Sequence, residues 1–206
     1  MFEIAEYIGT IAFAMSGFFV GVRSRLDFLG VSISVFLTAF GGGVIRDIIV
    51  DKVPYTFTHT TPGLIVLGVM SLLTIFKFHK KQSIENRALF IFSDSIGLAS
   101  FSITGAIIAL EMNLNLTGVL ALSFVTAVGG GITRDIIINE IPFVFKTGFY
   151  GTVSLLVGLL MYLLHLLSLI NFYTTVAIFI FAITIRVFAY YQKWSIPLEV
   201  GKSTER

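Results

Sequence analysis

The segment that decides the fold reads GGGVIRDII at positions 41–49, and it recurs as GGGITRDII at positions 129–137. The shift from position 41 to position 129 also matches residues outside the motif: Phe13 with Phe101, Gly17 with Gly105, Thr38 with Thr126 and Pro54 with Pro142. Matches spread so widely are hard to assign to chance. The sequence therefore indicates an internal duplication.

The composition is that of a membrane protein. The chain has 206 residues, of which 56% are hydrophobic and 13% charged, and its mean hydropathy is +0.94. Soluble chains carry roughly a quarter charged residues. A soluble enzyme, a nucleic-acid binder and a disordered scaffold are therefore implausible, and a net charge of +2 offers no footprint for nucleic acid. Without cysteine there is no disulfide or thiolate metal site.

Seven apolar stretches reach or approach the roughly 20 residues that a spanning helix needs. They are 4–22, 29–50, 62–78, 88–110, 116–138, 148–168 and 172–191. Each copy of the duplication holds three spans, an odd number, so the second copy must be inverted in the membrane relative to the first. We therefore expect an all-α integral membrane protein with seven transmembrane helices. Its parts are two inverted three-helix repeats (1–86 and 87–170), a seventh transmembrane helix (171–193) and a cytoplasmic tail (194–206).

The basic residues predict the orientation. If the N-terminus is outside, twelve of the fourteen Lys and Arg residues fall on the inner side of the membrane. Basic residues favour cytoplasmic loops, so we expect the N-terminus outside and the C-terminus in the cytoplasm. The first seven residues carry Glu3 and Glu6 but no basic residue, which argues against a cleavable signal peptide.

The triple glycines lie near the middle of the second and fifth spans. Each glycine disfavours helix by about 1 kcal/mol relative to alanine. Broken backbone is tolerated in a membrane only where protein or a water-filled cavity satisfies it. We therefore expect both helices to be broken and to share one site near the midplane. The glycines concerned are Gly41, Gly42, Gly43, Gly129, Gly130 and Gly131. The alternative is that they only let another helix approach closely.

Each triple glycine is followed by an arginine and an aspartate, Arg46 with Asp47 and Arg134 with Asp135. Charges inside a membrane are costly and normally face a partner or water. Because adjacent helical residues point about 100° apart, we do not expect each arginine to pair with the next aspartate. A carbonyl at the glycine break or a carboxylate from another helix is the expected partner. Snorkelling to the headgroups is the alternative.

Asp94 lies early in the fourth span and corresponds to Glu6 in the duplication. We expect a carboxylate at headgroup level, with a point of ion entrance as the alternative. No Walker, Rossmann or hydrolase motif occurs, so an enzyme is not expected. We also expect no cofactor and no metal beyond transient potassium.

The paired glycine and Arg-Asp motifs, each followed by Pro-Tyr or Pro-Phe, resemble those of the prokaryotic trimeric intracellular cation (TRIC) channels. That family overlaps bacterial membrane proteins whose repeat is called a glycine-transporter domain. The resemblance spans about residues 1–190. It implies a homotrimer in the cytoplasmic membrane of a prokaryote, with a potassium-permeable pore in each subunit between kinked second and fifth helices. The two Arg-Asp pairs would line or brace that pore, in contact with membrane lipids around the trimer.

Two functions stay open at this stage. In a channel, helix breaks offer carbonyl oxygens to a cation, and Asp47 and Asp135 add negative charge. In a secondary transporter, the same breaks present helix N-termini, and Arg46 or Arg134 holds the carboxylate of a small amino acid such as glycine. The mixed charge leans toward a zwitterion, whereas the resemblance favours the channel. A purely structural scaffold would not explain charged glycine motifs in both copies.

Overall fold

The computed structural model describes residues 1–78, 84–146, 149–192 and 194. This part of the chain is helical throughout and contains no strand. The helices are α1 Phe2–Arg23, α2 Phe28–Ile49, α3 Tyr55–Thr58, α4 Thr61–Ile75, α5 Ile84–Glu111, α6 Leu116–Ile137, α7 Phe143–Lys146, α8 Tyr150–Leu166 and α9 Phe172–Tyr191. Most of the expected tail, residues 195–206, lies outside the described residues.

Five of the described helices are long and apolar enough to cross a membrane: α1, α2, α5 from Arg87, α6 and α9. The other two expected spans, 62–78 and 148–168, appear as the shorter apolar helices α4 and α8, with 15 and 17 residues. Large apolar side chains such as Phe28 and Phe145 are exposed on the outside, as a lipid-facing surface requires. The protein is therefore an all-helical membrane protein in the part that the structure describes.

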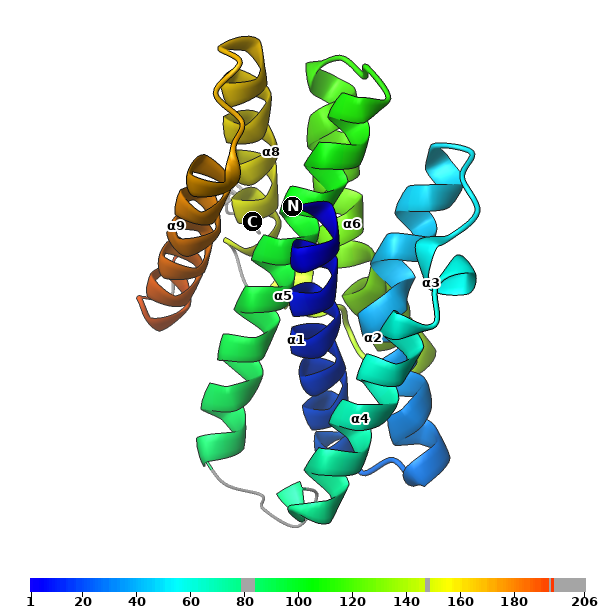
Figure 1. Ribbon diagram of the computed structural model, residues 1–206. Helices are drawn as coiled ribbons and strands as arrows, with labels where there is room; N and C mark the ends of the chain where they lie inside the picture. Colours follow the sequence, from blue (N-terminus) through cyan, green and yellow to red (C-terminus); the bar gives the residue numbers. More distant parts are fainter. Residues whose placement is uncertain (79–83, 147–148, 193, 195–206) are drawn as a thin grey trace, which may run out of the picture.

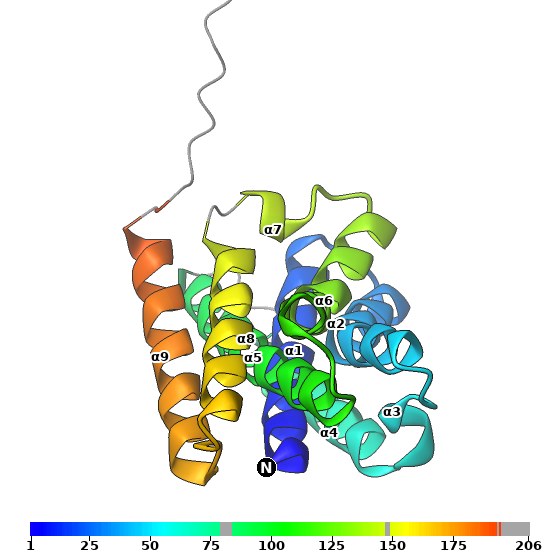
Figure 2. The ribbon, with the colours of Figure 1, turned by 90° about the horizontal axis from the view of Figure 1, so that it is seen from above.

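Helices α1, α2, α5 and α6 form the centre of the molecule (Figure 1). α1 and α5 pack along each other in opposite directions, and so do α2 and α6. From above, α8 and α9 lie on one side of this group, and α3 lies on the other (Figure 2). Between α1 and α5, the rings of Phe13 and Phe101 stack with centroids 5.2 Å apart.

The two copies of the duplication share local structure. Asp27 caps α2 by accepting from the Gly30 backbone N–H at 2.7 Å, and Asn115 caps α6 in the same way through Gly118 at 3.0 Å. Such side-chain acceptors satisfy the free N–H groups at a helix start. After these helices, Asp51 and Asn139 adopt left-handed backbone with φ of 56° and 58°. Equivalent positions therefore start and end α2 and α6.

The expected helix breaks are wrong. α2 runs as one helix through Gly41–Gly43, and α6 through Gly129–Gly131. The glycines instead remove the side chains where the two helices cross: a Cβ on Gly41 would lie 2.9 Å from the Cα of Gly130, and one on Gly42 would overlap the carbonyl oxygen of Thr126. Backbone contact between helices offsets the low helix propensity of glycine.

The small residues of α1 and α5 form seams within the chain. A Cβ on Gly17 would lie 2.8 Å from the Cα of Val35, and one on Gly105 would lie 2.9 Å from the Cα of Ser123. α1 therefore packs closely on α2, and α5 on α6. These seams fix the position of the α2–α6 crossing.

Candidate functional site

Beside the glycine crossing lies a first cluster of buried charges, built around Arg46 of α2. Its side chain is fully buried. Nε donates to Asp47 Oδ1 at 2.8 Å, and Nη1 donates to Glu6 Oε2 of α1 at 2.8 Å and to Thr104 Oγ1 of α5 at 3.1 Å. The guanidinium also lies 5.1 Å from the centroid of the Phe2 ring. One arginine therefore joins three helices through charge-assisted hydrogen bonds, which are the strong ones.

The second cluster lies around Arg134 of α6 and repeats part of this arrangement. Arg134 Nε and Nη2 contact Asp135 Oδ1 at 2.8 and 2.7 Å. Nη1 donates to Thr38 Oγ1 of α2 at 3.3 Å. Arg134 and Asp135 are both buried. This second arginine thus joins α6 to α2, and its ion pair lies within its own helix.

The two aspartates also anchor the chain that follows each helix. The backbone N–H of Tyr55, at the start of α3, donates to Asp47 Oδ2 at 2.8 Å. The backbone N–H of Phe143, at the start of α7, donates to Asp135 Oδ2 at the same distance. Each aspartate therefore uses one oxygen for its arginine and the other for the backbone eight residues further on.

The third glycine of each motif lies beside the arginine three residues later. A Cβ on Gly43 would lie 3.7 Å from Arg46 Nη2 and 3.3 Å from Glu6 Oε1, and one on Gly131 would lie 3.9 Å from Arg134 Nη2. Residues three apart on a helix are neighbours. The first two glycines therefore lie at the helix crossing, and the third lies next to the guanidinium.

Several expectations about these charges are wrong. Each arginine does pair with the adjacent aspartate, because a long side chain can bend toward a carboxylate that a backbone N–H holds in place. Neither arginine snorkels to the surface. The expected carboxylate from another helix is confirmed for Arg46, whose partner is Glu6.

Asp94 is buried inside the protein and does not lie at the end of its helix, where it was expected. α5 begins at Ile84, before the expected start of the span, so Asp94 lies about 15 Å along the helix at 1.5 Å per residue. Its side chain is buried, and Ser16 Oγ of α1 donates to its Oδ1 at 3.1 Å. Oδ2 has no hydrogen-bond partner among the residues that the structure describes.

Sequence reasoning missed Glu6 and Thr104 as members of these clusters. Glu6 is a charged residue inside an apolar span, which is itself a signal of a buried partner. Thr104 carried no such signal, because threonine is common in membrane helices.

Known proteins match this chain along most of its length. The family model described as "Glycine transporter" matches residues 3–80 and 91–166. The UPF0126 membrane protein YvgT of Bacillus subtilis is 34% identical over 195 residues, which cover 95% of each chain. The UPF0126 inner membrane protein YadS of Escherichia coli is 32% identical over 154 residues, covering 75% of this chain and 74% of that protein. The chain belongs to this membrane-protein family.

Solved structures of TRIC channels share the fold of this family member. A prokaryotic TRIC channel crystallised in 0.5 M KCl has a TM-score of 0.86 and 27% identity, covering 95% of this chain and 98% of that one. The TRIC trimeric intracellular cation channel orthologue from Rhodobacter sphaeroides has a TM-score of 0.84 and 26% identity, covering 94% and 98%. The resemblance to prokaryotic TRIC channels that the motifs suggested is therefore confirmed.

Proposed function

We propose that this chain is a cation channel in the cytoplasmic membrane, selective for monovalent cations such as potassium. Each subunit of a homotrimer would carry its own pore beside the crossing of α2 and α6. Support comes from the likeness to solved TRIC channels over nearly the whole chain. No catalytic role is proposed.

The observation that favours a channel over a carrier is that both motif arginines are already paired with carboxylates. Arg46 already binds the carboxylates of Glu6 and Asp47, and Arg134 binds that of Asp135. A guanidinium occupied in this way is a poor site for a substrate carboxylate. It also presents less positive charge to a passing cation, because an adjacent opposite charge offsets its field. Glu6, Arg46 and Asp47 together carry a formal charge of −1.

The glycine crossing suggests where conduction is controlled. α2 and α6 touch through Gly41 and Gly130, so cations need the two helices to separate or to shift at that point. Because no side chains intervene, a small movement there changes the space between the helices. The arginine clusters beside the crossing would determine the positions to which α2 and α6 return after such a movement.

A secondary transporter of a small amino acid is the second candidate. The description of the matched family model, "Glycine transporter", favours it. Such a carrier would need Arg46 or Arg134 to release a carboxylate partner before it binds substrate. Release of a buried ion pair is costly, and this ranks the carrier below the channel.

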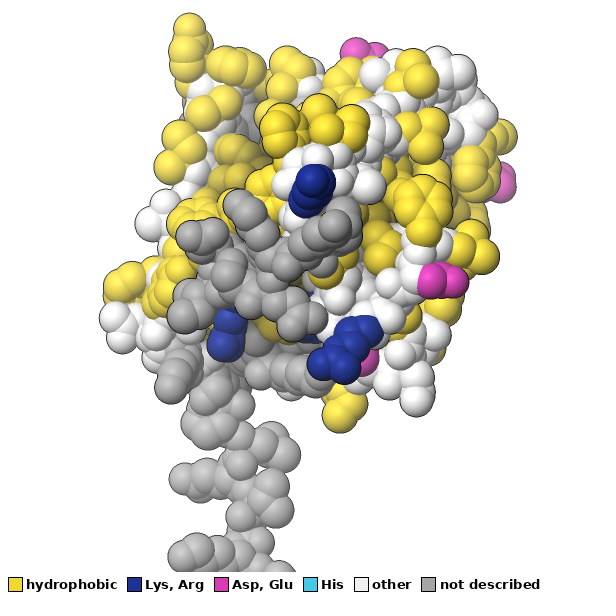
Figure 3. Space-filling view, turned by 90° about the horizontal axis from the view of Figure 1, so that it is seen from below, with side chains coloured by type: hydrophobic (Ala, Val, Ile, Leu, Met, Phe, Trp, Pro, Cys, Tyr) yellow, Lys and Arg dark blue, Asp and Glu magenta, His cyan; other side chains and the backbone are white. Residues whose placement is uncertain are grey.

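The proposed topology has seven spans, with α4 and α8 crossing as short helices. α1 to α4 and α5 to α8 form two inverted repeats (1–86 and 87–170), and α9 is the seventh span (171–193). The opposite directions of α1 and α5 and of α2 and α6 support this arrangement (Figure 1). Lys and Arg side chains are visible on the lower face (Figure 3). By the preference of basic residues for the cytoplasm, that face and the C-terminus would be inside and the N-terminus outside.

Single-channel recording of the purified protein in a planar bilayer with a potassium gradient tests the proposal. Discrete current steps that reverse near the potassium potential support a channel, since a carrier cycle moves too few ions for visible steps. Silence together with saturable uptake of labelled glycine into liposomes from the same preparation would overturn it. Liposomes without protein are the control for leakage.

A further inference from the structure

Arg186 of α9 is a third arginine buried inside the molecule. Its side chain is 1% exposed and lies among three aromatic rings, with its guanidinium carbon 4.7 Å from the Tyr150 centroid, 5.7 Å from that of Phe143 and 5.8 Å from that of Tyr190. Cation–π contacts stabilise such a charge only in part. Nε and Nη2 have no hydrogen-bond partner within the described part of the chain. A buried arginine of this kind calls for an opposite charge nearby.

Asp94 of α5 is the complementary group. It is as buried as Arg186, and its Oδ2 is likewise without a hydrogen-bond partner among the described residues. Tyr150 links the two: Arg186 lies over its ring, and its hydroxyl lies within reach of the Asp94 carboxylate. α9 packs directly on α5, and Arg186 and Asp94 lie on these two neighbouring helices.

Comparison of the two clusters explains why the second needs this extra charge. In the first cluster Glu6 reaches Arg46 at 2.8 Å. Asp94 takes the place of Glu6 in the second cluster but is shorter by one methylene, about 1.5 Å of reach. In the part of the chain that the structure describes, Asp94 forms no ion pair within 4.0 Å with Arg134 or with Arg186. The carboxylate of the second cluster thus lacks the arginine that its counterpart has.

We propose that Arg186 is the counter-charge of Asp94 and that it ties α9 to the second copy of the motif. Asp94, Arg134, Asp135 and Arg186 then form a neutral network, whereas the first cluster carries −1. Arg186 is a positioning residue: it supplies the positive charge that a buried carboxylate needs at Asp94, beside Ser16 of α1. α9 is thereby an electrostatic part of the conduction machinery and not an appendage. The effect on ion flux rests on the proposed function, whereas the charge pairing does not.

A double-mutant cycle tests the pairing. Arg186→Gln should lower potassium flux into liposomes by about tenfold and lower the melting temperature of the purified protein, because it leaves a buried carboxylate without its counter-charge. Asp94→Glu should restore contact with Arg134. The double variant Asp94→Glu/Arg186→Gln should therefore regain flux to within about threefold of wild type. Arg186→Lys, which keeps the charge, should retain most of the flux.

The matched control is Arg87→Gln. Arg87 is an exposed arginine that also reaches α9, through a 3.1 Å hydrogen bond to the Tyr190 hydroxyl, and its loss should leave flux unchanged. Wild-type flux in Arg186→Gln, or failure of Asp94→Glu to rescue both flux and melting temperature, would overturn the inference. If the wild type itself conducts no potassium, the proposed function fails. The melting temperatures alone then test the inference, which stands if Asp94→Glu offsets the loss caused by Arg186→Gln.

Discussion

The two copies of the motif are built alike within their own helices and differently across helices. In both, an arginine binds the next aspartate at 2.7–2.8 Å, and that aspartate binds a backbone N–H eight residues later at 2.8 Å. The long-range partner differs: Glu6 binds Arg46 directly, whereas Asp94 forms no ion pair with Arg134 among the described residues, and we propose Arg186 of α9 as its counter-charge. On this proposal, one methylene group decides whether the carboxylate reaches the arginine of its own copy or depends on an arginine of α9.

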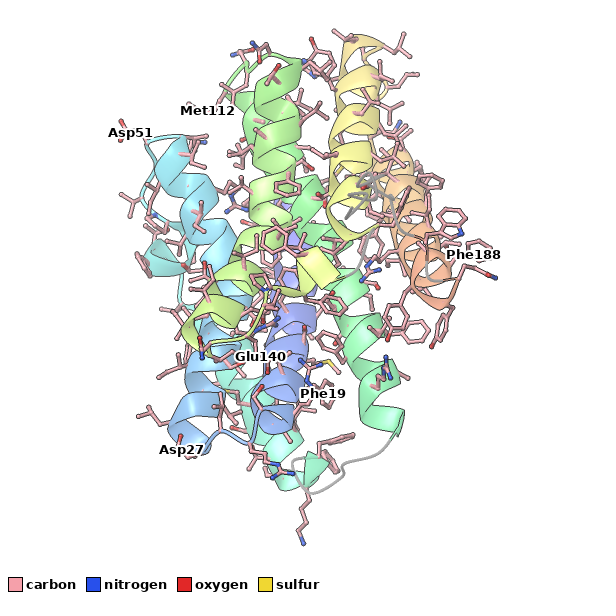
Figure 4. The ribbon with its side chains drawn as sticks, turned by 180° about the vertical axis from the view of Figure 1, so that it is seen from behind. Phe19, Asp27, Asp51, Met112, Glu140 and Phe188 are labelled. Atoms are coloured by element: carbon pink, nitrogen blue, oxygen red, sulfur yellow. The ribbon has the colours of Figure 1, made fainter. Side chains whose placement is uncertain are left out.

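The ends of the molecule differ in a related way. At the lower end of the molecule, Glu140 accepts a hydrogen bond from Ser24 Oγ at 2.7 Å and contacts Arg23 Nη2 at 3.5 Å. These contacts join the loop after α6 to the end of α1. Figure 4 shows Glu140 near the lower part of α1 and Asp51 at the opposite end. The equivalent residues at that end, Lys52 and Glu111, have reversed charges and form no ion pair within the described residues. Equivalent positions again make contact on one side only.

The largest effect is expected at the feature that both copies share, the glycine crossing. Gly42→Leu, and equally Gly130→Leu, should abolish potassium flux while the protein still inserts, because each side chain would meet the backbone of the partner helix. Flux into liposomes and the yield of membrane-inserted protein are measured together. Gly68→Leu is the matched control, since nothing lies within 4 Å of that position. Normal flux in both crossing variants would remove the crossing from the mechanism.

Shortening the carboxylate of the first cluster should make it resemble the second. Glu6→Asp should break the contact with Arg46 and cost about 3 kcal/mol of stability, because Arg46 is the arginine that pairs with Glu6 among the described residues. Thermal unfolding in detergent measures the loss. Asp94→Glu is the reciprocal change and should not destabilise the protein. Equal losses in the two variants would mean that carboxylate length does not distinguish the clusters.

The arginine–aspartate pair and its backbone anchor should respond equally to mutation in the two copies. Asp47→Asn and Asp135→Asn each weaken one arginine contact and one anchor of the following backbone, so each should lower stability by about 2 kcal/mol. Limited proteolysis should cut more readily in the segments after α2 and α6. A loss confined to one of the two variants would contradict the view that the motif alone builds this unit.

The smallest effect is expected at the lower end. Glu140→Gln should cost at most about 1 kcal/mol, because Arg23 is exposed and surface ion pairs are screened by salt. The loss should shrink further in high salt. Lys52→Gln, the control at the other end, should change nothing. A salt-independent loss in Glu140→Gln would point to its hydrogen bond with Ser24 as the main contact.

Much of the fold could be predicted because it depends on local composition. The expected span 172–191 coincides with α9, and 116–138 differs from α6 by one residue. The predictions were less accurate for α4 and α8, which are shorter than expected. The four-residue helices α3 and α7 were missed, because so short a helix leaves no periodic pattern.

The candidate site was predictable only in part. Arg46, Asp47, Arg134 and Asp135 stood out because charges are rare inside apolar spans. Their pairing was not foreseen, because it depends on how far a flexible side chain bends toward a carboxylate held by backbone. The helix breaks were expected from glycine propensity, but contact between α2 and α6 outweighs that propensity.

The sequence by itself determined that this chain is a helical membrane protein with a duplicated charged motif, because hydropathy and repetition are properties of the chain alone. Only the tertiary structure decided that the glycines form a helix crossing, that Glu6 closes the first cluster and that Asp94 and Arg186 are both buried inside the molecule. These outcomes depend on distances between helices and on the reach of single side chains. A difference of one methylene group is enough to change them.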